Sequence, residues 1–400
     1  MILEKISLNN FRNYSQQTVG FGKSFNYIYG NNGEGKTNIL EAISLITFGK
    51  SLVGSPEFDC VKFGEKAFYT EGIFKSRLDT KFSVSLDYNT DTKRKSYSLN
   101  KEKVSGFSSE IFGRFPVVFL TPHNLAITYG NPSERRRFFD IMISQTSKLY
   151  LEYLKDLNRL IKQKNALLKD FKENGKTAKN DFINILDSYN EKLIEISSEI
   201  IFRRFEFLAD FKNFFEEKFN YLTSGYDFPV IDYLLSSVRE IDWKDFSTYT
   251  YDDILGIMSA KFKEITDDEI SRGICLIGPQ RDDFVFKIIK NKSVSDNKLQ
   301  GFYLKNFASQ GEHKTFLIAL KLAEFDITRE KTSENPVMLL DDVLSELDSE
   351  RVTKIISYLK DFGQIFLTST EIGYVENIKN FYDNADVKIF KVENNSINQK

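Results

Sequence analysis

The sequence is poor in the residues that build metal centres and disulfide frameworks. Among its 400 residues it has two cysteines and two histidines. Cys60 and Cys275 lie far apart and form no metal-binding spacing, so we expect buried, reduced thiols in a cytosolic protein. With so few histidines a histidine metal site is not expected. Neither His123 nor His313 is expected to have a direct catalytic role.

The sequence also lacks the patterns of a membrane-spanning segment and of a signal peptide. No apolar run approaches the length needed to span a membrane, and the first residues do not have the form of a signal peptide. We therefore expect a cytoplasmic protein with no membrane partner. The formal net charge is −2, so any contact with nucleic acid must come from local patches. The composition, 41% apolar and 28% charged, is ordinary for a chain of two or three structural units.

The strongest positive signal is a glycine-rich motif at residues 30–37. It fits the phosphate-binding pattern G-x-x-x-x-G-K-[ST] and lies between an apolar run typical of a buried strand and a segment with helical spacing. The alternative is a glycine-rich turn on an ordinary helix. Lys36 is predicted to reach the β- and γ-phosphates, and the Thr37 hydroxyl to hold Mg²⁺. The predicted ATP-binding residues of the loop are Gly30, Asn31, Asn32, Gly33, Glu34, Gly35, Lys36 and Thr37.

A second nucleotide motif follows about 300 residues later. The apolar run 336–340, closed by Asp341 and Asp342, has the form of a Walker B strand. Asp341 is predicted to hold Mg²⁺, and Asp342 to orient or deprotonate the attacking water. Because loops at the carboxyl ends of parallel strands share one crevice, the two motifs can meet in a doubly wound sheet.

The region between the motifs is predicted to hold a sheet and a helical arm. Residues 66–104 alternate as antiparallel strands do. Residues 148–220 carry apolar side chains at alternating steps of four and three, broken at 174–177, which predicts two long antiparallel helices. Further strands are expected at 2–8, 18–21, 115–120 and on both sides of a polar corner within 273–287, and a helix at 254–270.

Two basic segments are candidates for nucleic-acid contact. Residues 148–179 contain nine Lys/Arg and four Asp/Glu, a local charge of +5 that could bind DNA or simply solvate the helix. Arg135, Arg136 and Arg137 are adjacent, so they cannot all face one side of a helix, and at least one should reach solvent, DNA phosphate or a partner.

Taken together, the motifs resemble those of the RecF family of bacterial recombination-repair proteins. The resemblance runs from residue 8 to about residue 370, in the family's order. The arginine triplet, the Gly-Pro-x-Arg-Asp-Asp corner and the Asp-Asp-Val-Leu-Ser-Glu-Leu-Asp run are the most specific parts. The matching segments are 11–14, 30–37, 130–140, 278–283, 309–312, 321–324 and 339–348.

The resemblance implies an α/β fold, a P-loop ATPase head of the ABC/SMC type with a mixed sheet, interrupted by a helical, short coiled-coil arm. The implied domains are 1–140 and 271–400 for the two parts of the head and 141–270 for the arm. In such heads a signature helix binds the γ-phosphate of the nucleotide held by a second subunit. The resemblance assigns this trans role to Ser309, Gln310, Gly311 and Asp348, and a share in ATP binding to Arg12, whose commoner alternative is a solvated surface arginine.

The same resemblance implies a function and partners. We expect a weak, slowly hydrolysing ATPase that is stimulated by DNA and uses ATP and Mg²⁺ as a switch for homodimerisation. It would bind single-stranded or gapped DNA through sites that could include the arginine triplet. With RecO and RecR it would promote RecA loading in recombinational repair, replication and the SOS response.

Some residues depart from the family pattern, and some alternatives stay open. The family usually has two acids where this chain has His123 and Asn124, so any contact made there is in doubt. A transporter nucleotide-binding subunit would favour Ser-Gly-Gly at 309–311 and lack the arginine triplet. A scaffold with a decayed P-loop would not be expected to keep Lys36 and Asp341. A phage-defence or toxin ATPase would append a nuclease domain, for which little chain remains.

Overall fold

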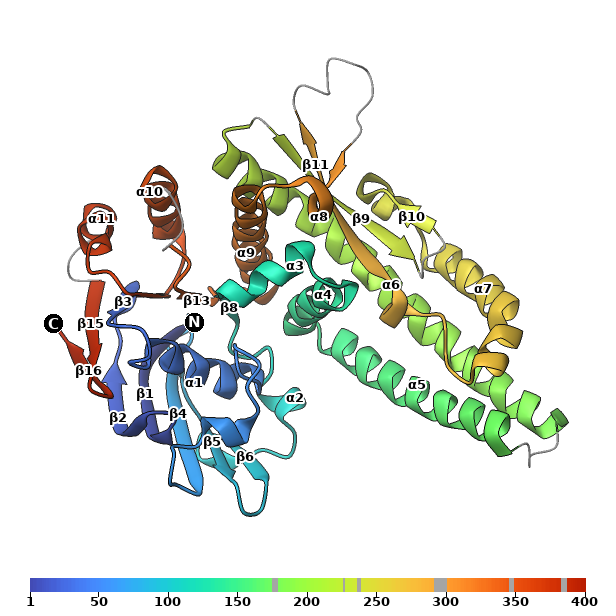
Figure 1. Ribbon diagram of the computed structural model, residues 1–400, viewed down its shortest axis with the longest axis horizontal. Coiled ribbons are helices and arrows are strands. Elements are labelled where there is room, and N and C mark those ends of the chain that lie inside the picture. Colours follow the sequence, from blue (N-terminus) through green and yellow to red (C-terminus); the bar gives the residue numbers. More distant parts are fainter. Residues whose placement is uncertain (175–178, 226, 236–238, 291–300, 345–348, 383–386) are drawn as a thin grey trace. The chain divides into compact units, whose positions relative to one another are not determined.

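A computed structural model gives the fold (Figure 1). It describes residues 1–400 apart from 175–178, 226, 236–238, 291–300, 345–348 and 383–386. Contacts divide the chain into two compact units, one formed by Met1–Leu125 with Leu320–Lys400 and the other by Ala126–Ala319. The chain thus leaves the first unit once and returns to it, so the two nucleotide motifs lie in the same unit.

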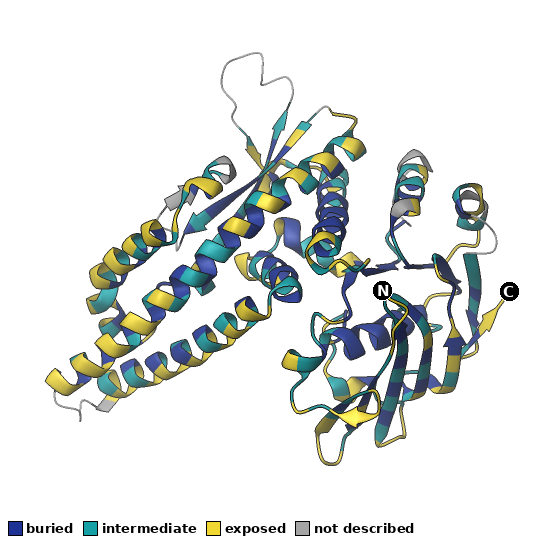
Figure 2. Cartoon of the chain, turned by 180° about the vertical axis from the view of Figure 1, so that it is seen from behind, coloured by how far each residue is buried: buried dark blue, intermediate teal, exposed yellow. Residues whose placement is uncertain are grey.

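The first unit contains a mainly parallel six-stranded sheet in the order β16-β15-β3-β14-β13-β8. All neighbouring strands are parallel except β16, which is antiparallel to β15. Every residue of the three central strands is buried, as expected for strands covered on both faces (Figure 2). The strands are β3 Phe25–Tyr29, β8 Val117–Leu120, β13 Val337–Asp341, β14 Ile365–Ser369, β15 Val387–Glu393 and β16 Ser396–Gln399.

A second sheet of the first unit is antiparallel, in the order β2-β1-β4-β5-β6-β7. It confirms the antiparallel sheet predicted for 66–104. The first two strands of the chain also belong to it, whereas the third, β3, belongs to the parallel sheet. The strands are β1 Ile2–Phe11, β2 Tyr14–Gly20, β4 Ala67–Lys75, β5 Lys81–Asn89, β6 Arg94–Leu99 and β7 Glu102–Lys103.

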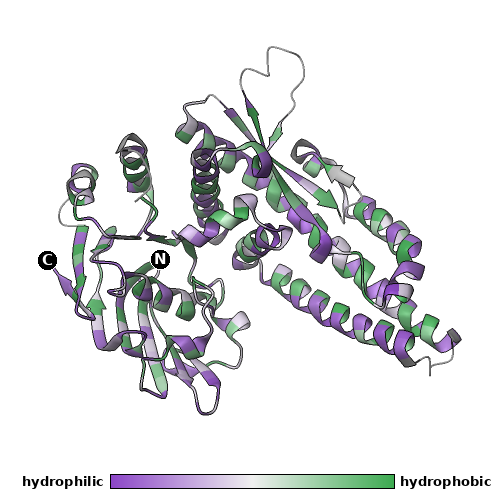
Figure 3. Cartoon of the chain, in the orientation of Figure 1, coloured by the Kyte–Doolittle hydropathy of each residue, from purple (hydrophilic) through white to green (hydrophobic). Residues whose placement is uncertain are grey.

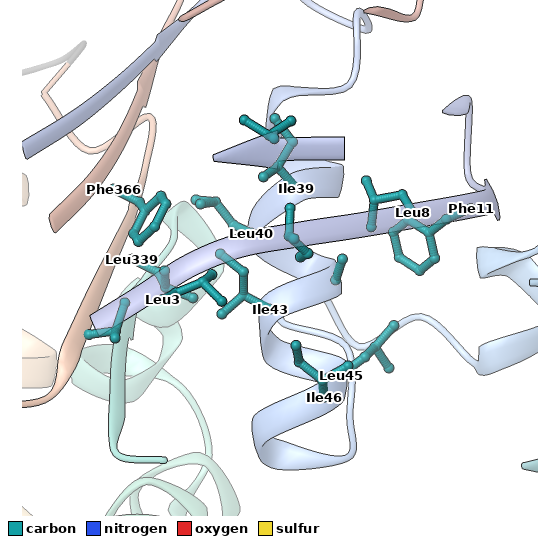
Figure 4. Packing of buried hydrophobic residues seen from close by; sticks show 14 of the residues in the cluster. Leu3, Leu8, Phe11, Ile39, Leu40, Ile43, Leu45, Ile46, Leu339 and Phe366 are labelled. Atoms are coloured by element: carbon teal, nitrogen blue, oxygen red, sulfur yellow. The ribbon is translucent and has the colours of Figure 1, made fainter. Parts of the chain in front are cut away.

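Helix α1, Lys36–Phe48, is buried between these two sheets. Its predicted apolar face is fully buried: Ile39, Leu40, Ile43 and Ile46 are each 0% exposed. Figure 4 shows these side chains among Leu3, Leu8 and Phe11 of β1, Leu339 of β13 and Phe366 of β14. The helix that follows the glycine loop is therefore the centre of the core, and this packing fixes where the loop lies.

Besides α1, the first unit contains one long helix, in part, and several short ones. Helix α9, Gln310–Thr332, spans the boundary between the units along the chain. The others are η1 Glu57–Cys60, α2 Phe107–Glu110, η2 Pro122–Leu125, α10 Ser349–Tyr358, η6 Leu359–Asp361 and α11 Tyr374–Phe381.

The second unit contains the predicted helical arm. Helices α5, Lys148–Asn174, and α6, Lys179–Thr223, confirm the two long helices, in which apolar and polar residues alternate (Figure 3). The predicted break between them falls largely on 175–178, outside the described residues. A third helix packs on both: α7, Tyr251–Arg272. The remaining helices are α3 Ala126–Tyr129, α4 Pro132–Thr146, η3 Trp243–Thr248, η4 Pro279–Arg281 and α8 Leu304–Phe307.

An antiparallel sheet in the order β10-β9-β11-β12 completes this unit. The prediction of a strand before the polar corner is wrong, because residues 274–277 do not form a strand. Backbone N–H groups there donate instead to side chains of neighbouring helices. The Cys275 N–H donates to the Asn165 side chain (2.6 Å), and the Leu276 N–H to the Glu269 carboxylate (2.7 Å). The strands are β9 Asp227–Leu235, β10 Arg239–Ile241, β11 Asp283–Lys290 and β12 Phe302–Tyr303.

The second unit extends beyond the arm predicted for 141–270 at both ends. Helix α4 and strand β11 explain the difference, because they pack on each other within this unit. The rings of Phe139 and Phe284 stack with centroids 4.1 Å apart. Contacts of this kind place residues 126–140 and 271–319 in the second unit with the arm, not in the first unit.

Candidate nucleotide site

The glycine-rich loop lies, as predicted, between a buried strand, β3, and the N-terminus of a helix, α1. Gly33 and Gly35 have φ angles of 82° and 109°, which L-residues with a side chain rarely adopt. A Cβ on Gly35 would also lie 2.5 Å from the side chain of Asn13. Glycine is therefore required at Gly35 both by its conformation and by a close neighbour.

The side chain of Lys36 folds back over the loop. Its Nζ donates to the carbonyl oxygens of Gly30 (2.8 Å) and Asn31 (2.9 Å). Burial lowers the pKa of Lys36, and the nearby carboxylates of Asp342 and Asp341 oppose that effect. The ammonium is thus held at the mouth of the loop, where it can exchange backbone oxygens for phosphate oxygens.

The two nucleotide motifs meet at Thr37 and Asp341. The Thr37 hydroxyl lies 2.9 and 3.0 Å from the two carboxylate oxygens of Asp341, although 304 residues separate them. Thr368, at the end of the intervening strand β14, donates its hydroxyl to the same carboxylate (2.7 Å). Hydroxyl and carboxylate oxygens are the ligands that Mg²⁺ prefers, so these residues fit the ion.

Asp342 follows directly at the end of the Walker B strand. Its φ of 48° lies in the left-handed region, which aspartate tolerates better than most residues. The backbone N–H donates to the Thr368 hydroxyl (3.0 Å), which holds this conformation. Its predicted role toward the attacking water stays a prediction.

Arg12 is engaged within the protein. Its guanidinium forms two hydrogen bonds with the Glu41 carboxylate, at 2.7 and 2.6 Å, and a third with the carbonyl oxygen of Asp59. Glu41, on α1, is 1% exposed and also accepts from Ser51 (2.5 Å). The predicted contact of Arg12 with nucleotide stays a prediction, and the structure places the side chain against α1 instead. No sequence motif marks Glu41, the buried acid of α1 that Arg12 contacts.

The predicted signature residues lie at the start of α9. Ser309 and Glu312 cap the helix reciprocally: the Ser309 N–H donates to the Glu312 carboxylate (2.7 Å), and the Glu312 N–H to the Ser309 hydroxyl (3.3 Å). Burial would raise the pKa of Glu312, but hydrogen bonds from Lys290 and Ser309 lower it. Ser309 and Gln310 are exposed, and Gly311 is half-buried. Asp348, the fourth residue assigned to the trans contact, lies outside the described residues.

The surroundings of His313, on α9, predict a pH dependence of stability. Its Nδ1 lies 2.9 Å from the Thr128 hydroxyl, and burial lowers the pKa of the ring. Since the unfolded chain binds a proton with a pKa of about 6.5, stability is full above that value and decreases as the pH falls toward the lowered pKa. We expect NMR titration to place His313 below 6.5, and the variant His313→Gln to lose less stability than wild type between pH 7 and 5.

The His313→Gln variant also assigns the resonances, because it removes one of the two histidine signals. A titration of His313 at or above 6.5 would contradict the expectation.

The arginine triplet does not present three equivalent side chains. Arg135 is buried and forms two 2.8 Å hydrogen bonds with the Asp283 carboxylate. Arg136 donates to the carbonyl oxygen of Asp282 (2.5 Å), and burial lowers its pKa. Arg137 is exposed. Contact of the triplet with DNA or a partner stays a prediction, for which Arg137 is the accessible member.

A buried polar network joins two of the sequence motifs. Arg204 of α6, 1% exposed, donates to Asp140 (2.8 Å) at the end of the triplet motif and to the Tyr233 hydroxyl (2.7 Å). Tyr233 in turn donates to Asp282 of the polar corner, and Tyr150 donates to Asp140. Arg204 and both tyrosines lie in segments whose sequence is typical of an ordinary arm helix or strand, so no sequence motif marks them.

The basic segment of the arm is partly neutralised. Lys164 is buried and pairs with Glu269 of α7 at 2.5 Å. Three other cations pair with acids on the same helix: Lys155 with Glu152, Arg159 with Asp156 and Lys169 with Glu173. Such exposed pairs contribute little energy, and they do not change the excess of positive over negative side chains in the segment. DNA contact by this helix therefore stays a prediction.

The positions that depart from the family pattern form a turn. Asn124 accepts the N–H of Thr121 through its side-chain oxygen (2.8 Å), and His123 is exposed. An acid at position 124 could make the same hydrogen bond, so the departure preserves the local backbone.

Both cysteines are buried and free, as predicted. Burial raises the pKa of Cys60 to about 12 and that of Cys275 to about 11, so both stay protonated at neutral pH.

Comparison with known proteins identifies the family. The family model described as RecF/RecN/SMC N terminal domain matches residues 2–398. The DNA replication and repair protein RecF of Chloroherpeton thalassium is 37% identical over 374 residues, which cover 93% of this chain and 95% of that protein. The chain belongs to the RecF family. The RecF of Chlorobium luteolum is another relative, 35% identical over 93% of this chain and 94% of its own length.

Solved structures show the same relationship. The recombination mediator protein RecF–ATPrS of the RecFOR pathway has a TM-score of 0.83 and 31% identity, covering 99% of this chain and 97% of that one. The structure of RecF–ATP from the same pathway has a TM-score of 0.82 and 30% identity, covering 100% and 99%. An Smc head domain from Pyrococcus furiosus shares the fold, with a TM-score of 0.55 at 16% identity, covering 100% and 96%. The predicted fold class, an ABC/SMC-type head with a helical arm, is confirmed.

No helix in the described part of this RecF-family chain is long and apolar enough to cross a membrane.

Proposed function

We propose that this RecF-family chain is an ATP-binding protein of DNA replication and repair that uses ATP as a dimerisation switch. The observation that carries the proposal is the pairing of the Thr37 hydroxyl with the Asp341 carboxylate, which joins the phosphate loop to the Walker B strand. Two further findings support it: the relatives are DNA replication and repair proteins by name, and a similar RecF structure was solved with ATP.

Each residue of the site has a task in this proposal. Backbone N–H groups of 31–37 and the positive end of α1 would bind the phosphates. Lys36 would leave the carbonyl oxygens that it now contacts and bind the β- and γ-phosphates. Thr37 and Asp341 would hold Mg²⁺, which when bound neutralises charge on the phosphate oxygens. Asp342 would orient the attacking water or accept its proton.

The switch itself requires two copies of the chain. Ser309, Gln310 and Gly311 of one copy, with Asp348, would contact the γ-phosphate held by the other copy. The exposed position of Ser309 at a helix N-terminus suits an incoming phosphate. Hydrolysis would then be slow and stimulated by DNA, because it serves to release the dimer.

We further propose single-stranded or gapped duplex DNA as the ligand of the dimer. RecO and RecR would be partners in RecA loading and the SOS response, and the cytoplasm the location. The two similar RecF structures are of a recombination mediator in the RecFOR pathway, which supports the partnership.

Binding to a labelled gapped duplex tests the switch. By fluorescence anisotropy we expect wild type to bind about tenfold tighter with ATP–Mg²⁺ than without, a usual size for coupling between two sites. Ser309→Arg should lose that gain but keep its ATP-free affinity, because the substitution leaves the chain's own P-loop intact and blocks the trans contact. Ser309→Ala should lose less of the ATP-dependent gain in DNA affinity, since alanine adds no bulk.

The matched control is Ser247→Arg, which adds the same charge at another exposed serine. If ATP does not change DNA affinity, or if Ser309→Arg behaves like wild type, coupling of ATP to DNA through dimerisation has to be abandoned. If Ser247→Arg loses the ATP gain as well, added charge and not the signature contact is responsible.

A further inference from the structure

The last two strands of the chain end in a tight hairpin turn. Strands β15 and β16 pair from Glu393 with Ser396, which leaves Asn394 and Asn395 as the turn. Both turn residues have positive φ angles, 52° and 57°. This is the pattern of a two-residue type I′ turn, in which asparagine and glycine are favoured.

This turn contacts the phosphate-binding loop, more than 350 residues earlier in the chain. The Asn394 backbone N–H donates to the Glu34 carboxylate (2.9 Å), within the loop motif. The side-chain oxygen of Asn395 accepts from the Asn13 amide (2.8 Å). The same Asn13 amide donates to the backbone carbonyl of Glu34 (2.6 Å).

The glycines of the loop are packed from both sides. A Cβ on Gly30 would lie 2.3 Å from the carbonyl oxygen of Val392, near the hairpin turn. A Cβ on Gly35 would lie 2.5 Å from the Asn13 amide. Tyr14, next to Asn13, donates its hydroxyl to the Gly35 carbonyl (3.0 Å). The loop therefore contacts both the β1–β2 turn and the β15–β16 hairpin, which also contact each other through Asn13 and Asn395.

Glu34 gives these contacts a consequence for anion binding. It is the one acid within 30–37, and a carboxylate that reached the phosphates would repel them. The hydrogen bond from Asn394 holds that carboxylate at the hairpin. The Asn13 amide fixes the Glu34 backbone at the same time, so the direction of the neighbouring N–H groups is set from outside the motif.

We propose that the side chains of Asn13 and Asn395 are positioning residues of the nucleotide site, which together with the backbone N–H at position 394 hold the phosphate-binding loop in its anion-accepting shape. The inference rests on the proposed function, because it assumes that the loop binds a nucleotide. It assigns to the C-terminal hairpin a share in nucleotide affinity, although the hairpin belongs to neither nucleotide motif.

The hairpin sequence offers a matched pair of substitutions. Asn395→Gly removes the side-chain oxygen that Asn13 contacts, yet Asn-Gly is a preferred type I′ sequence, so the turn should persist. Asn394→Gly keeps both the backbone N–H that Glu34 uses and the Asn395 side chain. We expect Asn395→Gly to bind ATP–Mg²⁺ and ADP about five- to tenfold more weakly, with an unchanged melting temperature without nucleotide. Asn394→Gly should bind like wild type.

A double-mutant cycle separates positioning from general stability. Asn13→Ala should weaken nucleotide binding about tenfold. Adding Asn395→Gly should weaken it by less than the product of the two single effects, because each substitution removes the same hydrogen bond between Asn13 and Asn395. In steady-state hydrolysis KM should rise while kcat stays close to wild type.

The outcomes distinguish the two proposals. If wild type binds no nucleotide in calorimetry, the proposed function fails and the inference with it. If wild type binds and Asn395→Gly binds equally well, only the inference is overturned. A weaker Asn395→Gly accompanied by an equally weak Asn394→Gly, or by additive effects in the cycle, also overturns it, since the shared hydrogen bond would then not be the cause.

Discussion

Lys36→Met is expected to weaken ATP binding at least about 100-fold and to abolish hydrolysis. Lys36 is 7% exposed, and no other cation of the loop motif can replace its charge there. Hydrogen bonds to charged groups contribute about 1.5–3 kcal/mol each. Two such bonds to phosphate oxygens account for the expected loss. Isothermal titration calorimetry with ATP–Mg²⁺ measures the affinity, and phosphate release measures the hydrolysis.

Lys23→Met is the control, because Lys23 is an exposed lysine of the same unit. It should bind ATP like wild type. Lys36→Met also removes two hydrogen bonds to backbone carbonyls, so its melting temperature without nucleotide must be compared with wild type. An affinity within threefold of wild type in a folded Lys36→Met protein would rule out the proposed phosphate site.

Each of the two nucleotide motifs could be predicted because its residues are contiguous in the sequence. Residues 30–37 and the strand closed by Asp341 carry their own context of strand, loop and helix. Their meeting could be inferred from the rule that parallel strands end at one edge of a sheet. The contact from Thr37 to Asp341 follows from that rule and from no local signal.

Other parts of the fold depend on pairings that no local pattern encodes. The alternation of β1 and β2 predicts strands, but not that they join β4 in a sheet separate from β3. The burial of Lys164 is another case: a lysine on a polar helix reads as solvated, until Glu269 of a distant helix pairs with it. Asn13 and Asn395 are 382 residues apart and hydrogen-bond directly.

Arg204→Met is expected to lower the stability of the second unit by about 3–5 kcal/mol, the usual result of removing one partner of a buried ion pair. Of the contacts described above, the Asp140 carboxylate would keep only the one with the Tyr150 hydroxyl. Asp282, which is 0% exposed, would lose the Arg204 guanidinium 3.7 Å away. Burial raises the pKa of Tyr150 and Tyr233 well above the usual value, so both hydroxyls stay neutral and do not replace the missing positive charge. Methionine keeps most of the volume but none of the hydrogen bonds.

The adjacent residue provides the control for this prediction. Arg203 is part of the same helix, but it is partly exposed, pairs with Glu199 one turn away and lies over the ring of Tyr153. Arg203→Met should therefore change stability by less than about 1 kcal/mol. Hydrogen exchange followed by mass spectrometry reports the two units separately: Arg204→Met should accelerate exchange in α4, α6 and β11 and leave β3 and β13 unchanged. Equal effects of the two substitutions would show that the network joining Asp140 to Asp282 does not hold this unit together.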